Sequence, residues 1–215
     1  MGRRSSHTPL QLRALILDAT QEIIEAHGLA GLSAREIARR VGYSAGTIYN
    51  IFANLDDVVL NVEARVLDTL DRRLGETQQR NGGDPADGTA RCDRLLALAH
   101  AYLAVAQERP RLWNLLSEHH MPPEAELPPW YRQKLEAPTT HIERALAPCF
   151  APGREAERQR AARAVWAGVH GIASLSTTDK LSLVTAETAA RLIDDLIATY
   201  LAGLTGQQSP KRQGP

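Results

Sequence analysis

Cysteine, lysine and aromatic residues are scarce in this chain of 215 residues. The two cysteines, Cys92 and Cys149, stand far apart, so neither a disulfide framework nor a thiolate metal site is expected. No apolar run approaches the roughly 20 residues that span a bilayer, and the polar, basic start lacks the apolar core of a signal peptide. We therefore expect a cytoplasmic protein with no membrane partner.

A net charge is also absent, because 25 basic residues balance 25 acidic ones. The distribution is uneven. Residues 1–55 carry six arginines and four acidic residues, a net charge of +2, which leaves −2 for the rest. The sign of this mild asymmetry fits an amino end that faces nucleic acid.

No stretch shows the period-two alternation of a strand, whereas helical spacing recurs throughout, so the expected fold is all-α. Gly28 and Gly42 end the first two helical patterns, and a long fourth helix begins after Asn54. Later helices are expected over residues 91–107, 110–119, 130–147, 154–177 and 186–204.

The run NGGDPADG at residues 81–88 has the composition of a loop and gives a soft domain boundary. We expect a head over residues 1–80 with a basic amino-terminal arm, and a larger helical domain over residues 81–205. The polar tail at residues 206–215 is expected to be disordered.

Two short helices with a glycine-bearing turn between them predict a helix-turn-helix, whose second helix can lie in a DNA major groove. Small residues fill the leading turn of that helix, so its backbone can approach the groove: Ser44, Ala45, Gly46 and Thr47. The Thr47 methyl suits a thymine, and the Tyr49 phenol can donate to a phosphate. Ile48, Ile51 and Phe52 are expected to face a three-helix core.

Three successive helix starts are marked by capping residues, Ser33, Ser44 and Asn54. Ser33 and Glu36 have the spacing of a capping box. Each helix start offers unpaired N–H groups to an anion, and DNA phosphates are suitable guests. The plainer alternative is that these residues only cap their helices. Arg3 and Arg4, in the amino-terminal arm, can enter a minor groove, or they form a solvated terminus.

Residues 11–62 resemble the DNA-binding domain of the TetR family of bacterial repressors. The matching residues are Ala19, Gly28, Ser33, Ile37, Ala38, Val41, Gly42, Ser44, Gly46, Thr47, Ile48, Tyr49, Phe52 and Val58. The resemblance implies a homodimer with two heads on a palindromic DNA operator, and a helical domain that binds a small-molecule effector. The full predicted DNA-contact set is Arg4, Ser33, Arg35, Ser44, Ala45, Gly46, Thr47, Tyr49 and Asn50. Leu55 departs from the family, which usually has lysine there.

In the larger half, small residues recur along one line of the helix at residues 161–175, where another helix can come close. Trp166, His170 and Gly171 resemble the signature of the WHG class of TetR-type carboxy-terminal domains. The resemblance implies dimerisation through the last two helices. Trp113, Trp130, Trp166 and His170 are the candidates for an effector pocket, and packing in the core is their alternative role. They suggest a mostly apolar effector.

Three functions compete. The first is a repressor that an effector releases from DNA. The second is an enzyme built on Ser174 and His170, which lacks any nucleophile elbow or oxyanion loop; we expect no enzyme and no cofactor. The third is a dimeric small-molecule-binding protein whose DNA contact has weakened, which Leu55 favours. The adjacent His119 and His120 lack metal-ligand spacing, so no metal is expected.

Overall fold

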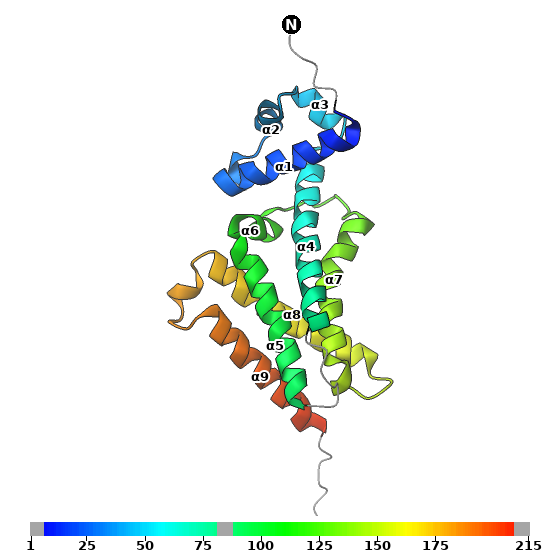
Figure 1. Cartoon of the computed structure of the whole chain (residues 1–215), viewed down its shortest axis with the longest axis vertical. Helices are drawn as coiled ribbons and strands as arrows, with labels where there is room; N and C mark the ends of the chain where they lie inside the picture. The colour runs from blue at the N-terminus through cyan, green and yellow to red at the C-terminus, as the bar shows by residue number, and fades with distance from the viewer. Residues whose placement is uncertain (1–6, 81–87, 209–215) are drawn as a thin grey trace, which may run out of the picture. The chain divides into compact units, whose positions relative to one another are not determined.

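The computed structural model describes residues 7–80 and 88–208. Within these ranges the chain forms nine α-helices and no strand, so the predicted all-α fold is confirmed (Figure 1). The helices are α1 (Pro9–His27), α2 (Ala34–Val41), α3 (Ala45–Tyr49), α4 (Leu55–Arg80), α5 (Gly88–Glu108), α6 (Pro110–Glu118), α7 (Pro129–Leu146), α8 (Glu155–Thr177) and α9 (Ala189–Gln208). None of the described helices combines the length and apolar character needed to cross a membrane.

The described residues form two compact units. The N-terminal unit comprises residues 7–67 and 111–131, and the C-terminal unit comprises residues 68–80, 88–110 and 132–208. The division falls inside α4, whereas the run at 81–88, where the composition predicts a soft boundary, lies outside the described residues except for Gly88 at the start of α5. The physical reason is that α6 buries Leu112 and Leu115 in the same core as α1 and the first half of α4. The assignment of functions to residues 1–80 and 81–205 stays a prediction.

The first three helices begin and end where their caps dictate. The Thr8 hydroxyl accepts from the Gln11 N–H at 3.3 Å while the Gln11 side chain accepts from the Thr8 N–H at 2.9 Å, a capping box that precedes Pro9 at the first helical position. Gly42 ends α2 with φ 75°, in the left-handed region that glycine adopts without steric cost. This turn redirects the chain into α3, and α2 packs against both α1 and α3 (Figure 1).

A closed apolar core holds the helix-turn-helix together. Ile48 of α3 and Ile37 of α2 are fully buried, and Phe52 is 1% exposed. Burying each such side chain contributes about 1.5–3 kcal/mol. Ile51 is only partly buried against this core, so the predicted inward orientation is confirmed for Ile48 of α3 and for Phe52, which follows the helix, and holds in part for Ile51.

A buried polar cluster lies on the first half of α4. The Glu63 side chain, which is 3% exposed, accepts from the Tyr131 hydroxyl at 2.6 Å and lies 3.1 Å from Nδ1 of His119. The Nε2 atom of His119 lies 3.2 Å from Asp56. The hydrogen bond to Glu63, reinforced by the nearby carboxylates, raises the pKa of His119 above its ordinary value.

The raised pKa predicts how stability depends on pH. Protonated His119 contributes stability that is fully present below its unfolded pKa, and this contribution is lost as pH rises through the higher folded pKa. We expect the urea midpoint of the protein to fall across that window, and to fall less in the His119→Asn variant. The urea midpoint of both proteins is measured from pH 5.5 to 9. If it changes with pH equally in the two, His119 is not protonated in the folded state.

In the C-terminal unit, α5, α8 and α9 pack on one another (Figure 1). A Cβ atom placed on Gly168 would lie 2.7 Å from Cδ2 of Leu196. The small residue therefore lets α9 approach α8 closely within one chain. At Gly171, one turn further along, a Cβ would meet nothing within 4 Å, so this part of the predicted small-residue line stays open.

Candidate nucleic-acid interface and effector cavity

The leading turn of α3 is capped and small. The Ser44 hydroxyl accepts from the Thr47 N–H at 3.2 Å and lies 2.9 Å from the Thr47 hydroxyl. Gly46 is exposed, whereas Ala45 and Thr47 are partly buried. The backbone of this turn is thus presented with little side-chain bulk. In this structure the Thr47 hydroxyl is engaged with Ser44, which leaves its methyl as the group better suited to a base edge.

The polar residues that follow are exposed. Tyr49 retains 50% of its accessible surface, and Asn50 is exposed beside it. On α2, Arg35 is exposed and forms no ion pair within the described ranges. These side chains are accessible to a partner, as the predicted DNA-contact set requires. Arg4 lies outside the described residues.

The capping box predicted at the start of α2 is only half formed. The Ser33 hydroxyl accepts from the Glu36 N–H at 3.1 Å, as expected. The Glu36 carboxylate instead pairs with Arg39, at 2.6 Å and 2.8 Å, and this contact lowers the pKa of Glu36. A forked guanidinium at i+3 offers two charge-assisted hydrogen bonds, whereas the backbone of Ser33 offers one N–H. The prediction of a reciprocal capping box was therefore wrong.

Asn54 caps α4, because its side-chain oxygen accepts from the Asp57 N–H at 2.8 Å. Asp57 also accepts from the Ala53 N–H at 3.0 Å. Leu55, between them, is partly buried against the core of the N-terminal unit. Leu55 therefore has a packing role that a lysine at this position would fill less well.

Two of the predicted effector residues meet in the C-terminal unit. The rings of Trp166 and His170 stack with centroids 5.3 Å apart and planes 16° apart. The Tyr102 hydroxyl lies 2.9 Å from Nδ1 of His170, and Ser174 Oγ lies 3.4 Å from Nε2. Burial lowers the pKa of His170, so a neutral imidazole accepts at one nitrogen and donates at the other. Burial also raises the pKa of Tyr102, which keeps its hydroxyl a donor.

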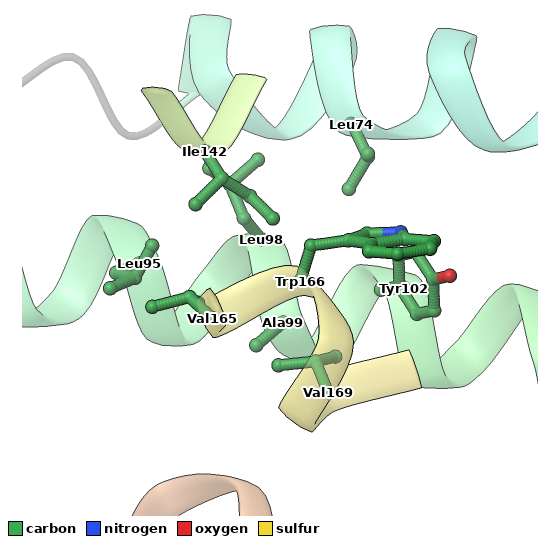
Figure 2. A pocket seen from close by; sticks show the side chains of 9 residues that line it. All are labelled: Leu74, Leu95, Leu98, Ala99, Tyr102, Ile142, Val165, Trp166 and Val169. Carbon is green, nitrogen blue, oxygen red and sulfur yellow. The ribbon is translucent and has the colours of Figure 1, made fainter. Parts of the chain in front are cut away.

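These residues adjoin an apolar cavity between α4, α5, α7 and α8 (Figure 2). Its lining residues are Leu74, Leu95, Leu98, Ala99, Tyr102, Ile142, Val165, Trp166 and Val169. The cavity volume is only about 10 Å³, at the lower limit of the roughly 10–15 Å³ that one water molecule needs. His170 is not among these lining residues and instead contacts two of them. Tyr102 was not a sequence candidate, although it continues the helical spacing of Leu95, Leu98 and Ala99.

The other two predicted effector residues are placed in the N-terminal unit. Trp113 is 1% exposed within α6, and Trp130 is 39% exposed, with its ring edge against Tyr131 at 5.7 Å between centroids. Neither lines the cavity around Trp166. The predicted pocket wall of four residues is therefore divided: Trp166 and His170 lie together, and the two remaining tryptophans belong to a different compact unit.

The histidines of the EHHM stretch have separate partners. His119 contacts Glu63 and Asp56, whereas His120 Nδ1 lies 2.8 Å from the Glu118 carbonyl. In the Ser174–His170 pair considered for an enzyme, the second imidazole nitrogen faces a tyrosine hydroxyl rather than a carboxylate. A catalytic triad would place an orienting acid there.

Comparison with known proteins adds to this geometry. The family profile described as "Bacterial regulatory proteins, tetR family" matches residues 16–62, and "Tetracyclin repressor-like, C-terminal domain" matches residues 95–200. The chain belongs to the TetR family of bacterial transcriptional regulators. Membership in the TetR family was predicted from residues 11–62 and is confirmed. The profile that matches residues 95–200 does not carry the name WHG. Assignment to the WHG class therefore rests on the Trp166–Gly171 motif alone.

TetR-family relatives are similar in sequence and in fold. The HTH-type transcriptional regulator Rv1816 of Mycobacterium tuberculosis is 28% identical over 123 residues, which cover 53% of this chain and 49% of that protein. The chain thus spans about half the length of the curated relatives it matches. A Rhodococcus sp. RHA1 protein of unknown function superposes with a TM-score of 0.71 at 21% identity, covering 94% of this chain and 98% of that one. Thermus thermophilus FadR, a TetR-family repressor in complex with lauroyl-CoA, gives 0.65 at 18% identity, covering 94% and 100%.

Proposed function

We propose that this TetR-family chain is a homodimeric repressor, which binds a palindromic operator through α3 and is released by a small, mostly apolar effector. The observation that carries the proposal is the leading turn of α3. Its backbone is capped by Ser44 and bears small residues, while Ile48 and Phe52 anchor it to a closed core. A rigid element with a low-bulk polar surface is what direct reading of a major groove requires.

Phosphate contacts would fix the register of α3 on the duplex. Tyr49 and Arg35 are exposed donors, and the capped starts of α2 and α4 add backbone N–H groups. Such contacts carry affinity without sequence information. A cation such as Arg35 also releases counterions when it neutralises a phosphate, which makes binding depend on salt. We place the protein accordingly in the bacterial cytoplasm, associated with the nucleoid.

Homodimerisation is proposed through α8 and α9. Leu175 is 40% exposed on α8, and Gly171 leaves open space beside it. Tyr200 and Leu204 are only partly buried on α9. A two-fold dimer uses the same patch on both subunits, and it would present two heads to a palindrome.

The effector is proposed to act from the apolar cavity of the C-terminal unit. Leu74, which lines the cavity, stands on α4, the helix whose first half packs Val58 and Val62 into the core under α3. A ligand that shifts α4 would therefore change the population of DNA-competent states. T. thermophilus FadR, which is similar in fold, is in complex with lauroyl-CoA, and the apolar lauroyl chain of that ligand supports an effector with an apolar part.

A footprint on the DNA upstream of the protein's own gene tests the proposal. The expected result is protection of a palindrome. The binding constant should fall by about 0.9 log units per phosphate neutralised for each tenfold rise in salt concentration. An absence of DNA affinity even at low salt would contradict it. That outcome would favour the alternative, a dimeric small-molecule-binding protein whose DNA contact has weakened at Leu55.

Leu55→Lys separates these alternatives further. The new cation would lie beside the backbone N–H groups that follow Asn54, so we expect tighter DNA binding and a salt slope steeper by about one unit. Leu55→Gln is the control, because it loses the same packing without adding charge. If the lysine variant keeps the wild-type slope, the start of α4 does not reach a phosphate.

A further inference from the structure

A chain of side-chain hydrogen bonds joins α1 to the segment that follows α3. The Arg13 guanidinium on α1 donates to Oδ1 of Asn61 on α4 at 2.6 Å. Nδ2 of Asn61 donates to the Asp57 carbonyl at 2.7 Å and to Oδ1 of the Asp57 carboxylate at 3.0 Å. Oδ2 of Asp57 accepts from the Ala53 N–H at 3.0 Å. Arg13, Asn61 and Asp57 thus form one continuous network, here called the Arg13 network, inside the N-terminal unit.

Asn61 allows a cation and an anion to share this network. A guanidinium only donates, and the Asp57 carbonyl and carboxylate oxygens only accept, so an acceptor and a donor are needed between them. The Asn61 amide supplies both. Its orientation is fixed, because a flipped amide would set donors against donors and acceptors against acceptors. An aspartate at this position would repel Asp57, and a leucine would bond to neither neighbour.

Both ends of the Arg13 network reach the segment just after α3. Asp57 holds the Ala53 N–H, and the Arg13 guanidinium carbon lies 4.5 Å from the centroid of the Phe52 ring. The Phe52 N–H donates to the Ile48 carbonyl of α3 at 3.0 Å. The helix α3 has only five residues, fewer than the roughly 12–15 at which an isolated helix becomes even marginally stable. Its orientation therefore depends on what holds the residues around it.

We propose that the Arg13 network positions α3 for sequence reading, and that none of its three residues acts as a DNA contact. The network fixes the segment after α3 to α1 and α4, and so holds the carboxyl end of the reading helix at one angle. Hydrogen bonds to base edges are directional, so they are lost when α3 tilts. Phosphate contacts tolerate the tilt and carry no sequence information. Loss of the network therefore removes discrimination between DNA sequences rather than affinity for DNA as such.

Asn61→Leu is the direct test, because it nearly keeps the size of the side chain and removes both bonds of the amide without changing charge. Fluorescence anisotropy measures dissociation constants for the DNA fragment upstream of the protein's own gene and for a scrambled duplex of equal length. The ratio of the two constants is the sequence preference. It is expected to fall about tenfold, the loss of roughly one good base contact. The salt slope on the scrambled duplex should not change, since no phosphate contact is lost.

Gln21→Leu is the matched control. Gln21 of α1 accepts from Arg65 of α4 at 2.5 Å. This variant therefore also loses an amide–arginine bond between the same two helices, at other positions and again without a change in charge. Its sequence preference is expected to equal that of the wild type. If stability alone determined the preference, both variants would lose it.

A double variant tests whether Arg13 acts through Asn61. Arg13→Leu breaks the network at its first residue and is expected to lower the sequence preference at least as far as Asn61→Leu. Combining the two should cause no loss beyond that of Arg13→Leu, because effects within one network are not additive. A salt slope shallower by about one unit in Arg13→Leu would show instead that Arg13 contacts a phosphate directly, which would overturn its positioning role.

Hydrogen exchange without DNA measures the order of α3 itself. The N–H groups of Asn50, Ile51 and Phe52 donate to carbonyls of α3. They are expected to exchange about tenfold faster in Asn61→Leu, because the end of the helix opens more often. In the control variant they should exchange at the wild-type rate.

Four further results would overturn the proposal. They are an unchanged sequence preference in Asn61→Leu, an equal loss in the Gln21→Leu control, additive losses in the double variant, and wild-type exchange at the end of α3 in Asn61→Leu. The inference rests on the proposed reading of DNA by α3. If the wild type itself shows no preference for the upstream fragment, the proposed function fails, and hydrogen exchange still decides whether the Arg13 network holds α3.

Discussion

Replacing Glu63 by alanine is expected to lower the free energy of unfolding by about 3–5 kcal/mol. The Glu63 carboxylate is buried, accepts from Tyr131 at 2.6 Å and lies 3.1 Å from His119. Its removal leaves a buried hydroxyl and an imidazole without the acceptor they share. An uncompensated buried polar group costs far more than an exposed ion pair contributes.

Urea denaturation followed by circular dichroism measures this effect. Glu76→Ala is the matched control on the same helix, since Glu76 is 42% exposed in its pair with Arg72. The control is expected to change the free energy of unfolding by no more than about 1 kcal/mol. Similar losses in the two variants would mean that the Glu63 cluster is solvated rather than buried.

Phe52→Ala is expected to destabilise the N-terminal unit by a similar amount, about 3–5 kcal/mol. Phe52 is 1% exposed in the core beneath α3, and the Arg13 guanidinium carbon lies 4.5 Å from the centroid of its ring. The substitution leaves a cavity and removes a cation–π contact. Because Phe52 lies three residues after the end of α3 and its N–H donates to the Ile48 carbonyl at 3.0 Å, DNA binding should be lost along with the order of that helix.

Hydrogen exchange of the α1–α3 amides, together with the footprint, measures both consequences. Leu10→Ala is the control, because Leu10 is 78% exposed and surface substitutions of this kind change stability by about 0.5 kcal/mol or less. Full protection of the α3 amides in Phe52→Ala would contradict a role for this ring in holding the helix.

Short-range signals in the sequence correctly predicted where the first helices begin and end. Gly28 and Gly42 end α1 and α2, and Ser44 and Asn54 cap the helices that follow them. These features depend on residues within one turn of each other, and hydrogen-bonding and torsional preferences act at that range. Even at this range, two donors competed for one acceptor. The Glu36 carboxylate accepts from Arg39 rather than from the Ser33 N–H that a capping box would use.

The effector site was harder to predict because its parts come from distant segments. Trp113, Trp130 and Trp166 are alike in the sequence, yet only Trp166 lines the cavity. Tyr102, which reaches His170 across 68 residues of chain, was not predicted. Spacing along one helix shows which residues share a face, but it does not show which other helix that face meets.

The sequence by itself determined the all-α fold, the helix-turn-helix and the family, since these depend on periodicity, caps and an ordered run of matching residues. Only the tertiary structure decided that α6 belongs with the head, that Glu63 is buried between His119 and Tyr131, and that Trp166 is the tryptophan that lines the apolar cavity. The physical reason is that burial is a property of packed surfaces. The partners of a side chain across a core are fixed by the packing of whole helices, which no short stretch of sequence encodes.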